Sequence, residues 1–399
     1  MRISTQGIHH AALTALLGQQ TVLSRTQTQI ASGKRVQTPA DDPVAAVHIM
    51  ELQRALAESE QFNLNADMAK NRLTLEEQAL ADANTLMQRV RELTIQGSNA
   101  SVDPASRRML AAEVRGHVKD LMDLANRRDA NGEYLFSGYA TLTQPFASSG
   151  GAISYFGDQG SRALQIGQDQ RVIDSHSGQD VFMAVTGGNG VFVTSAGAGN
   201  TGNGMIASGT IVDPAQWVVG DYTLRFTSAT GDYEIVDSAA TVVATGTYTE
   251  NSTISFNGAN INMTGMPAQN DSFAISRSRT EDVFTTLSNL AATLESSTAT
   301  QADRAQFNSD MATALQQLDQ VSDHLLSVRA DVGTRLSAID NAQESLADRK
   351  VELETTASQL RDLDYAEAVS RMNQQLVGLQ AAQASYSKIA QLSLFDYLR

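Results

Sequence analysis

Apolar residues recur with helical spacing near both ends of the chain. In the N-terminal part, Leu16, Leu23 and Ile30 are seven residues apart. In the C-terminal part the spacing of seven relates Val332, Ile339, Leu346, Leu353 and Leu360, and an alternation of three and four then relates Val369, Met372, Leu376 and Leu379. Such spacings predict long helices with an apolar stripe. Because one helix cannot bury its own stripe, we expect packing against other helices of the chain, a neighbouring copy, or both.

Helix-capping residues predict where these helices begin and end. Asp42-Pro43 is typical of an N-cap followed by proline in the first turn, and no Pro or Gly then occurs before Gly97. One long helix is therefore predicted from Val44 to Gly97. Asp103-Pro104 repeats the start signal, and Asn131-Gly132 predicts the end of that second helix.

A further long helix is predicted from about residue 302, with a break around residues 362–364. The Leu and Val residues of 43–130 and 302–360 are interpreted as intramolecular core, since their stripes face helices of comparable length within the same chain.

The middle of the chain has a different pattern. Of the 28 glycines, 20 lie within residues 138–280, which contain no lysine. Gly220-Asp221-Tyr222 and Gly231-Asp232-Tyr233 recur 11 residues apart, which is typical of successive strands of an antiparallel meander. Short strands are predicted at 222–226, 233–236, 241–243, 253–256 and 272–275, with a weaker one at 191–194.

These patterns predict a mainly α fold with an inserted β domain. Residues 41–139 and 281–361 are expected to form a helical stem, a coiled coil or bundle built from both chain ends. Residues 140–280 are expected to form a Gly- and Thr-rich β domain that projects outward. Residues 1–40 and 362–399 are interpreted as terminal arms that are disordered in the monomer.

The two arms have weak apolar stripes, because Gln, Ser, Thr and Gly occupy many of the positions that a core would use. Such segments fold poorly alone and are suited to becoming ordered against copies of themselves. The alternative is an ordinary pair of helices in a monomer. Under the first interpretation the candidate assembly interface consists of Leu13, Leu16, Leu23, Ile30, Met372, Leu376, Leu379, Ile389 and Leu392.

Composition and charge exclude several classes of protein. The formal net charge of -15 disfavours a general nucleic-acid binder, because phosphates would be repelled. The absence of Cys excludes disulfides, thiolate metal sites and cysteine nucleophiles. No apolar run is long enough for a membrane helix, and the N-terminal residues lack the apolar core of a cleavable signal peptide. Ordinary rules therefore predict a cytosolic protein without membrane insertion.

Candidate chemistry is sparse. The histidines at 9, 10, 48, 117, 176 and 324 do not have metal-ligand spacing, so no metal site is predicted. Gly197-Ala-Gly-Asn-Thr-Gly202 matches a dinucleotide-binding string but is not followed by a helical segment, and it is interpreted as a flexible loop. A glycosidase-like pair among Asp158, Asp169, Asp174 and Asp180 has no other support. We predict no cofactor, no catalytic residue and no enzymatic activity.

Three stretches near the two ends of the chain resemble a known family. Ala31-Ser-Gly-Lys-Arg-Val-Gln-Thr-Pro-Ala-Asp-Asp-Pro43 is similar to the stretch after the first helix of flagellins and flagellar hook–filament junction proteins. Asp362-Leu-Asp-Tyr-Ala-Glu-Ala-Val369 and Leu379-Gln-Ala-Ala-Gln-Ala-Ser-Tyr-Ser-Lys-Ile389 resemble the C-terminal arm of this flagellin-like family. Within the family, Gly132-Glu-Tyr-Leu-Phe-Ser-Gly138 with Pro145-Phe146, and the ending Gln391–Leu398, resemble the junction proteins more than the flagellins.

The resemblance implies a structural component of the bacterial flagellum, extracellular and exported by the flagellar type III apparatus without a cleaved signal peptide. It implies an adaptor that joins the preceding hook-associated junction protein to flagellin and forms a ring with other copies of itself. It also implies a cytosolic export chaperone that holds the C-terminal arm, within Val369–Leu392. The alternatives are a flagellin, or a surface enzyme or adhesin on a helical stalk.

Overall fold

The computed structural model describes residues 5–207 and 209–397, without the side chains at 5, 6, 8, 9 and 389–397. The α-helices in this part of the chain are α1 (Thr5–Ser32), α2 (Pro43–Ser98), α3 (Pro104–Ala125), α4 (Val283–Glu295), α5 (Gln301–Arg361) and α6 (Tyr365–Tyr397). The chain divides into a terminal unit, residues 1–64 with 342–399, and a central unit, residues 65–341. Helices α2 and α5 contribute residues to both units.

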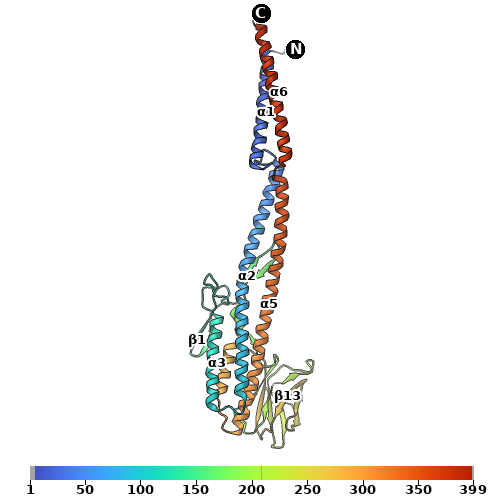
Figure 1. Cartoon of the computed structure of the whole chain (residues 1–399). Helices are drawn as coiled ribbons and strands as arrows, with labels where there is room; N and C mark the ends of the chain where they lie inside the picture. Colours follow the sequence, from blue (N-terminus) through green and yellow to red (C-terminus); the bar gives the residue numbers. More distant parts are fainter. Residues whose placement is uncertain (1–4, 208, 398–399) are drawn as a thin grey trace. The chain divides into compact units, whose positions relative to one another are not determined.

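In the terminal unit, α1 and α6 pack against each other, as Figure 1 shows. Gly378 of α6 faces the side chain of Gln19 on α1, since a Cβ atom at Gly378 would lie 3.9 Å from Nε2 of Gln19. Residues 33–42 connect α1 to α2 and lie against the end of α5, where Lys34 forms a β-bridge with Asp362. The predicted break after Arg361 is confirmed.

In the central unit, α3 and α4 pack against each other, and both start at capping aspartates. The Asp103 carboxylate accepts hydrogen bonds from the backbone N–H groups of Ala105 and Ser106, and Asp282 accepts one from Thr285. These bonds satisfy N–H groups that have no partner within the helix. The predicted starts of α2 and α3 are confirmed.

The predicted end of the second helix at Asn131-Gly132 is wrong, because α3 ends at Ala125. Asn126 is the C-cap of α3, and its backbone N–H still donates to the oxygen of Met122. Its side chain both donates to and accepts from the backbone of Phe146, which anchors the chain beyond the helix. Asp129 then accepts from the N–H groups of Asn131 and Glu133, and Gly132 adopts φ of 81°. The Asn-Gly pair therefore closes a turn that lies beyond the helix.

The middle of the described chain contains one short π-helix, η1 (Gln179–Met183), and many short strands. The strands are β1 (Phe146–Ser149), β2 (Ala152–Tyr155), β3 (Ala163–Gln165), β4 (Arg171–Ile173), β5 (Val185–Thr186), β6 (Phe192–Ala196), β7 (Met205–Ile206), β8 (Thr210–Ile211), β9 (Tyr222–Phe226), β10 (Asp232–Asp237), β11 (Val242–Thr247), β12 (Thr253–Phe256), β13 (Ala259–Thr264), β14 (Ser272–Arg277) and β15 (Thr280–Glu281).

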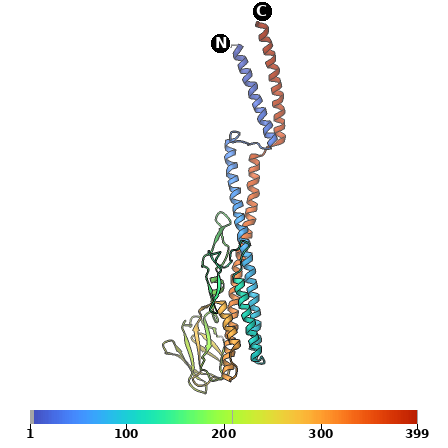
Figure 2. The same cartoon turned by 90° about the vertical axis from the view of Figure 1, so that its left-hand side faces the viewer.

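Strands β6–β14 form a β domain of two sheets, whose green and yellow strands are gathered in Figure 2, whereas β1 with β2, β3 with β4, and β5 with β15 form separate two-stranded sheets. One sheet has the strand order β11-β10-β9-β14-β6, and the other has β12-β13-β7 with β8 also paired to β13. The predicted meander is confirmed, since β9, β10 and β11 are successive antiparallel neighbours. Side chains of both sheets share one buried core that includes Leu224, Phe226, Ile261 and Phe273.

A second group of aromatic side chains lies outside that core. Phe136, Phe146, Phe182 and Phe284 are all fully buried, with ring centroids 5.2–6.1 Å apart where they pair. Three of these residues precede the two-sheet domain in the chain, and the fourth is in the first turn of α4. The prediction of a mainly α fold with an inserted β domain is confirmed.

Candidate assembly surface

Helix α1 carries four of the predicted interface residues, and their exposure differs. Leu23 is buried, Leu16 and Ile30 are half-buried, and Leu13 is 45% exposed. The apolar stripe of Leu16, Leu23 and Ile30 therefore faces partly inward, toward α6, while Leu13 remains exposed to solvent.

Helix α6 carries the other five predicted residues. Met372, Leu376 and Leu379 are half-buried. Ile389 and Leu392 fall within the bounds of α6, but their side chains lie outside the described residues. The structure thus brings the two predicted helices together, and the role of these nine residues in assembly stays a prediction.

Many large apolar side chains of the terminal unit are exposed although the sequence did not single them out for assembly. They share exposed positions on α1, α2, α5 and α6, and they are Leu17, Val22, Val44, Val47, Met50, Leu64, Val351, Tyr365, Val369 and Val377. In the sequence, Val44, Val47 and Met50 are spaced three residues apart at the start of α2. This spacing places them close together on one helix face. Exposed apolar side chains at this density are typical of surfaces that another chain covers.

The two terminal helices carry few charges. Arg25 is the one Asp, Glu, Lys or Arg residue within α1, and α6 carries Glu367, Arg371, Lys388 and Asp396. The buried polar positions of α1 are instead the uncharged Thr26 and Gln29. A surface of this composition can be covered by another chain without the cost of removing many ions from water.

The connector between α1 and α2 is held to the end of α5 by Arg35. Its guanidinium donates to the backbone oxygen of Leu360 at 2.7 Å and to the carboxylate of Asp42 at 3.1 Å. The backbone N–H of Arg35 also donates to the oxygen of Arg361 at 2.7 Å. The stretch that resembled the flagellin-like family is therefore the segment that ties both chain ends together.

Gly33 has a specific role in this connector. It adopts φ of 71°, and a Cβ atom there would lie 2.8 Å from the hydroxyl oxygen of Tyr365. Its carbonyl accepts from the N–H of Leu363 at 3.0 Å. The positive φ favours glycine at this position, whereas the Tyr365 hydroxyl is the end of an exposed side chain that could move aside.

Asp41 and Asp42 stay ionised in the connector. Backbone N–H groups, led by that of Thr38, lower the pKa of Asp41 below its ordinary value despite some desolvation. The backbone N–H of Ala45 lowers the pKa of Asp42, and the Arg35 guanidinium adds to this effect. Asp42 therefore caps α2 and pairs with Arg35 at the same time.

In the central unit, His176 joins the insert to α2 and α5, which the sequence did not predict. Its Nδ1 lies 2.6 Å from Oε1 of the fully buried Glu76, and its Nε2 lies 2.9 Å from Oδ2 of Asp331. Burial lowers the pKa of His176, but the hydrogen bond and charge of Glu76 outweigh burial and raise it above the ordinary value. Burial raises the pKa of Asp331, and His176 with Arg335 outweighs it in the opposite direction. A positive imidazolium is therefore favoured between two carboxylates.

The stretch Gly132–Gly138 surrounds a second buried charge. Arg72 on α2 is 5% exposed, and its guanidinium donates to the carboxylates of Asp129 and Glu133 and to the backbone oxygen of Tyr134. Leu135 and Phe136 are buried beside it. These contacts fix the turn after α3 on α2.

The Gly197–Gly202 loop does not open a helix, as expected. The carboxylate of the buried Asp271 accepts from the N–H groups of Thr201 and Gly202 at 2.8 and 3.0 Å. These N–H groups are thus occupied by the chain's own carboxylate, and the loop does not provide a phosphate-binding cradle. Within the described residues, no group of three or more His, Asp or Glu side chains could hold a metal ion, and no helix has an apolar stretch that could cross a membrane.

Comparisons with known proteins match both helical ends of the chain and, among solved structures, about three quarters of it. The family model for the bacterial flagellin N-terminal helical region matches residues 3–141, and the model for the C-terminal helical region matches residues 315–398. The crystal structure of FlgL from Xanthomonas campestris is 36% identical, with a TM-score of 0.72 over 99% of its own chain and 77% of this one. The chain belongs to the flagellar hook-associated protein 3 (FlgL) family.

Other FlgL-family relatives agree. The hook-associated protein 3 structure from Legionella pneumophila is 30% identical, with a TM-score of 0.75 over 98% of its chain and 78% of this one. Flagellar hook-associated protein 3 of Escherichia coli strain K12 is 32% identical over 186 residues, which are 47% of this chain. This match covers 58% of the length of that curated relative. The predicted resemblance to this family is confirmed, and the family is one of flagellar proteins.

Proposed function

We propose that the protein is a structural subunit of the bacterial flagellum at the hook–filament junction. In this role it joins the preceding hook-associated junction protein to flagellin and forms a ring with other copies of itself. It does so without catalysis or a cofactor. The observation that carries this proposal is the likeness to FlgL structures along 98–99% of their chains, at 30–36% identity.

The match to flagellins is weaker. The flagellin of Listeria monocytogenes is 26% identical over 119 residues, 30% of this chain. This difference favours the junction role over that of a filament subunit. A flagellin nevertheless stays the second candidate, because the two family models that match are named for flagellin.

The terminal unit supplies the means of assembly in this proposal. Apolar side chains such as Leu13, Val44 and Val377 are exposed in the single chain and would be buried between copies. Gln20, Gln27 and Gln383 are exposed on the same helices, so wrongly aligned copies would leave amide groups without partners. The β domain would then face outward.

The proposed route to this site is export by the flagellar type III apparatus without a cleaved signal peptide. A cytosolic chaperone would cover the C-terminal helix until export. Support for the chaperone comes from α6, where Val369 and Val377 are exposed and would otherwise promote aggregation before assembly.

Deletion of the gene, followed by assay of the culture medium for flagellin, tests the junction role. We expect non-motile cells with intact hooks and abundant unpolymerised flagellin in the medium, since the filament would have no anchor. A complete lack of extracellular flagellin would favour a flagellin or an export component. Normal motility would contradict both and favour an enzyme or adhesin on a helical stalk.

Seeded assembly separates the two structural candidates. A junction protein should add a limited number of subunits to isolated hooks and stop, whereas a flagellin should extend into long filaments. Electron microscopy of the products gives this result without any activity assay.

A further inference from the structure

Arg107 on α3 is a buried positive charge without a carboxylate partner. It is 4% exposed, and its Nη2 donates to the hydroxyl of Thr298 at 2.6 Å. Its Cζ lies 4.7 Å from the centre of the Phe307 ring, and its Nε has no hydrogen-bond partner. Among residues 5–207 and 209–397, no Asp or Glu lies within ion-pair distance of it.

The same unit contains an instructive contrast. Arg72 is buried to the same degree, but the carboxylates of Asp129 and Glu133 lie 3.3 and 3.2 Å from its Nη1. Removing a guanidinium from water costs several kcal/mol unless an opposite charge and hydrogen bonds compensate it. The carboxylates of Asp129 and Glu133 compensate the charge of Arg72 within the chain. The guanidinium of Arg107 instead contacts one hydroxyl group and one aromatic ring.

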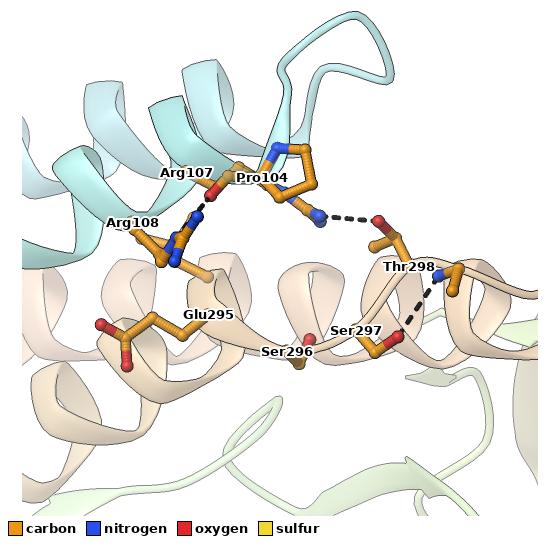
Figure 3. Close-up of a pocket in the computed structure, with 9 residues that line it drawn as sticks. Pro104, Arg107, Arg108, Glu295, Ser296, Ser297 and Thr298 are labelled. Atoms are coloured by element: carbon orange, nitrogen blue, oxygen red, sulfur yellow. Dashed lines mark hydrogen bonds between the residues drawn. The ribbon is translucent and has the colours of Figure 1, made fainter.

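Arg107 lines a pocket of about 370 Å³ between the first turn of α3 and the segment that joins α4 to α5. Figure 3 shows Arg107 and Arg108 on the α3 side and Ser296, Ser297 and Thr298 opposite them. Arg108 is exposed and donates to the backbone oxygen of Pro104 at 3.3 Å. It likewise has no ion-pair partner within the described chain, so two guanidinium groups without carboxylates face one pocket.

The one acidic residue of the pocket lining is already neutralised. Glu295 forms a bidentate ion pair with Arg115, in which each carboxylate oxygen lies 2.6 Å from one guanidinium nitrogen of Arg115. Arg115 lowers the pKa of Glu295, and the more distant Arg108 adds to this effect. The pocket therefore keeps an excess of positive charge in a chain whose net charge is -15.

We propose that this pocket binds an oxyanion group, a carboxylate or a phosphate, between the guanidinium groups of Arg107 and Arg108. Guanidinium groups suit such ligands because they present several N–H donors in a plane that matches two oxygens. The group comes either from a free anion or from an acidic side chain of a second copy of this chain. Both sources offer the same chemistry to the two arginines.

Titration of inorganic phosphate into the full chain, measured by calorimetry at constant ionic strength, tests the pocket directly. We expect one saturable site with a dissociation constant on the order of 1 mM, and a higher melting temperature in phosphate than in chloride. A wild-type chain that takes up no phosphate and no acetate in a saturable way overturns the proposal.

Matched variants localise the binding. Arg108→Gln removes an exposed pocket charge and should raise the dissociation constant about tenfold. Arg89→Gln removes a charge of α2 that is also exposed but lies outside the pocket, and it should leave the dissociation constant unchanged. Arg107→Lys keeps the charge but loses the planar donor set, so it should also weaken binding. If Arg107→Lys does not fold, the comparison of Arg108→Gln with Arg89→Gln still tests the proposal. Equal dissociation constants for these two variants overturn it.

Incorporation of the purified chain onto isolated hooks separates the two sources of the anion. If a second copy supplies a carboxylate, phosphate should inhibit incorporation of the wild type, and Arg108→Gln should be incorporated poorly in any buffer. If the site takes a free anion, phosphate should bind the monomer without lowering incorporation. The calorimetric result does not depend on the junction role, so failure of either proposal can be recognised separately.

Discussion

The two-sheet β domain and the terminal helices place the same kinds of apolar side chain in opposite surroundings. In the β domain, Leu224, Phe226 and Phe273 are completely buried in a core shared by both sheets. In the terminal unit, Leu17, Met50 and Val377 are more than half exposed on helices that pack in pairs. The β domain buries a large group of apolar side chains in a core of its own, although Val218 and Val219 on its surface are exposed, whereas the terminal unit leaves many such side chains exposed on its helices.

This difference separates stability from assembly. Burial of apolar area stabilises the β domain of a single chain, so its residues affect folding. The exposed apolar area of the terminal unit contributes little to that folding and becomes favourable only when another chain covers it. The buried ion pairs follow the same division, since His176 and Arg72 both lie in the central unit.

Phe273→Ala should produce the largest loss of stability. The ring is fully buried, and its centroid lies 6.0 Å from that of Phe226 in an edge-on arrangement. Removing it leaves a cavity, and we expect the free energy of unfolding of the β domain to fall by about 3–5 kcal/mol. Urea denaturation followed by the fluorescence of the single Trp217, which packs against this core, measures the change.

Phe156→Ala is the matched control, since Phe156 is 55% exposed in the same unit. It should change the free energy of unfolding by less than about 0.5 kcal/mol. Equal effects of the two substitutions would contradict the assignment of Phe273 to a closed core.

His176 should give the next largest effect. His176→Ala removes the imidazole that pairs with the buried Glu76 and leaves only the backbone N–H of residue 176 at 3.3 Å from its Oε1, which should cost about 1–3 kcal/mol in the unfolding of the central unit. The pKa of His176 is raised above 6.5 in the folded chain, so its stabilisation is complete below pH 6.5 and is lost as the pH rises through the folded-state value. Melting temperatures at pH 6 and pH 8 should therefore differ in the wild type.

The groups that face His176 are Glu76 from α2 and Asp331 with Arg335 from α5. The His176→Ala variant should lose most of the difference in melting temperature between the two pH values. A variant that keeps the full difference would show that other groups cause it.

Much of the helical part of the fold could be predicted because its signals are local. Asp42-Pro43 and Gly97 give α2 to within a residue at each end, and β9 and β12 have the predicted bounds. Helix α4 was missed although its signals were present, namely the Asp282 cap and an apolar pattern of Val283, Phe284, Leu287, Leu290 and Leu294.

The candidate sites were harder to predict because their partners are distant in the chain. His176 meets residues 100 and 155 positions away, and Arg107 meets Thr298 across 191 positions. Spacing along a sequence does not reveal such pairs. The end of α3 was predicted wrongly for a similar reason, since the side chain of its C-cap, Asn126, pairs with the backbone of Phe146, 20 positions away.

The double substitution Leu376→Ser with Leu379→Ser should have a smaller effect on the single chain. Both side chains are half-buried on α6, so we expect at most about 1 kcal/mol of lost stability, confined to the pairing of α1 with α6. Assembly should nevertheless fail, and a deletion strain carrying this variant should release flagellin into the medium.

Leu326→Ser serves as the control, because Leu326 is 46% exposed on α5 within the central unit. It should restore motility. A large drop in the melting temperature of the α6 variant would instead assign Leu376 and Leu379 to the core of the single chain.

Val377→Ser should have the smallest effect on folding, and it tests the comparison most directly. Val377 on α6 is 66% exposed and Val218 in the β domain is 61% exposed, so the same substitution removes a similar exposed area from each region. Both should change the free energy of unfolding by less than about 0.5 kcal/mol. Only Val377→Ser should reduce motility in the deletion strain, because another chain is expected to cover α6 and not the surface of the β domain around Val218. Equal motility of the two strains would place the assembly contacts on a different face of α6.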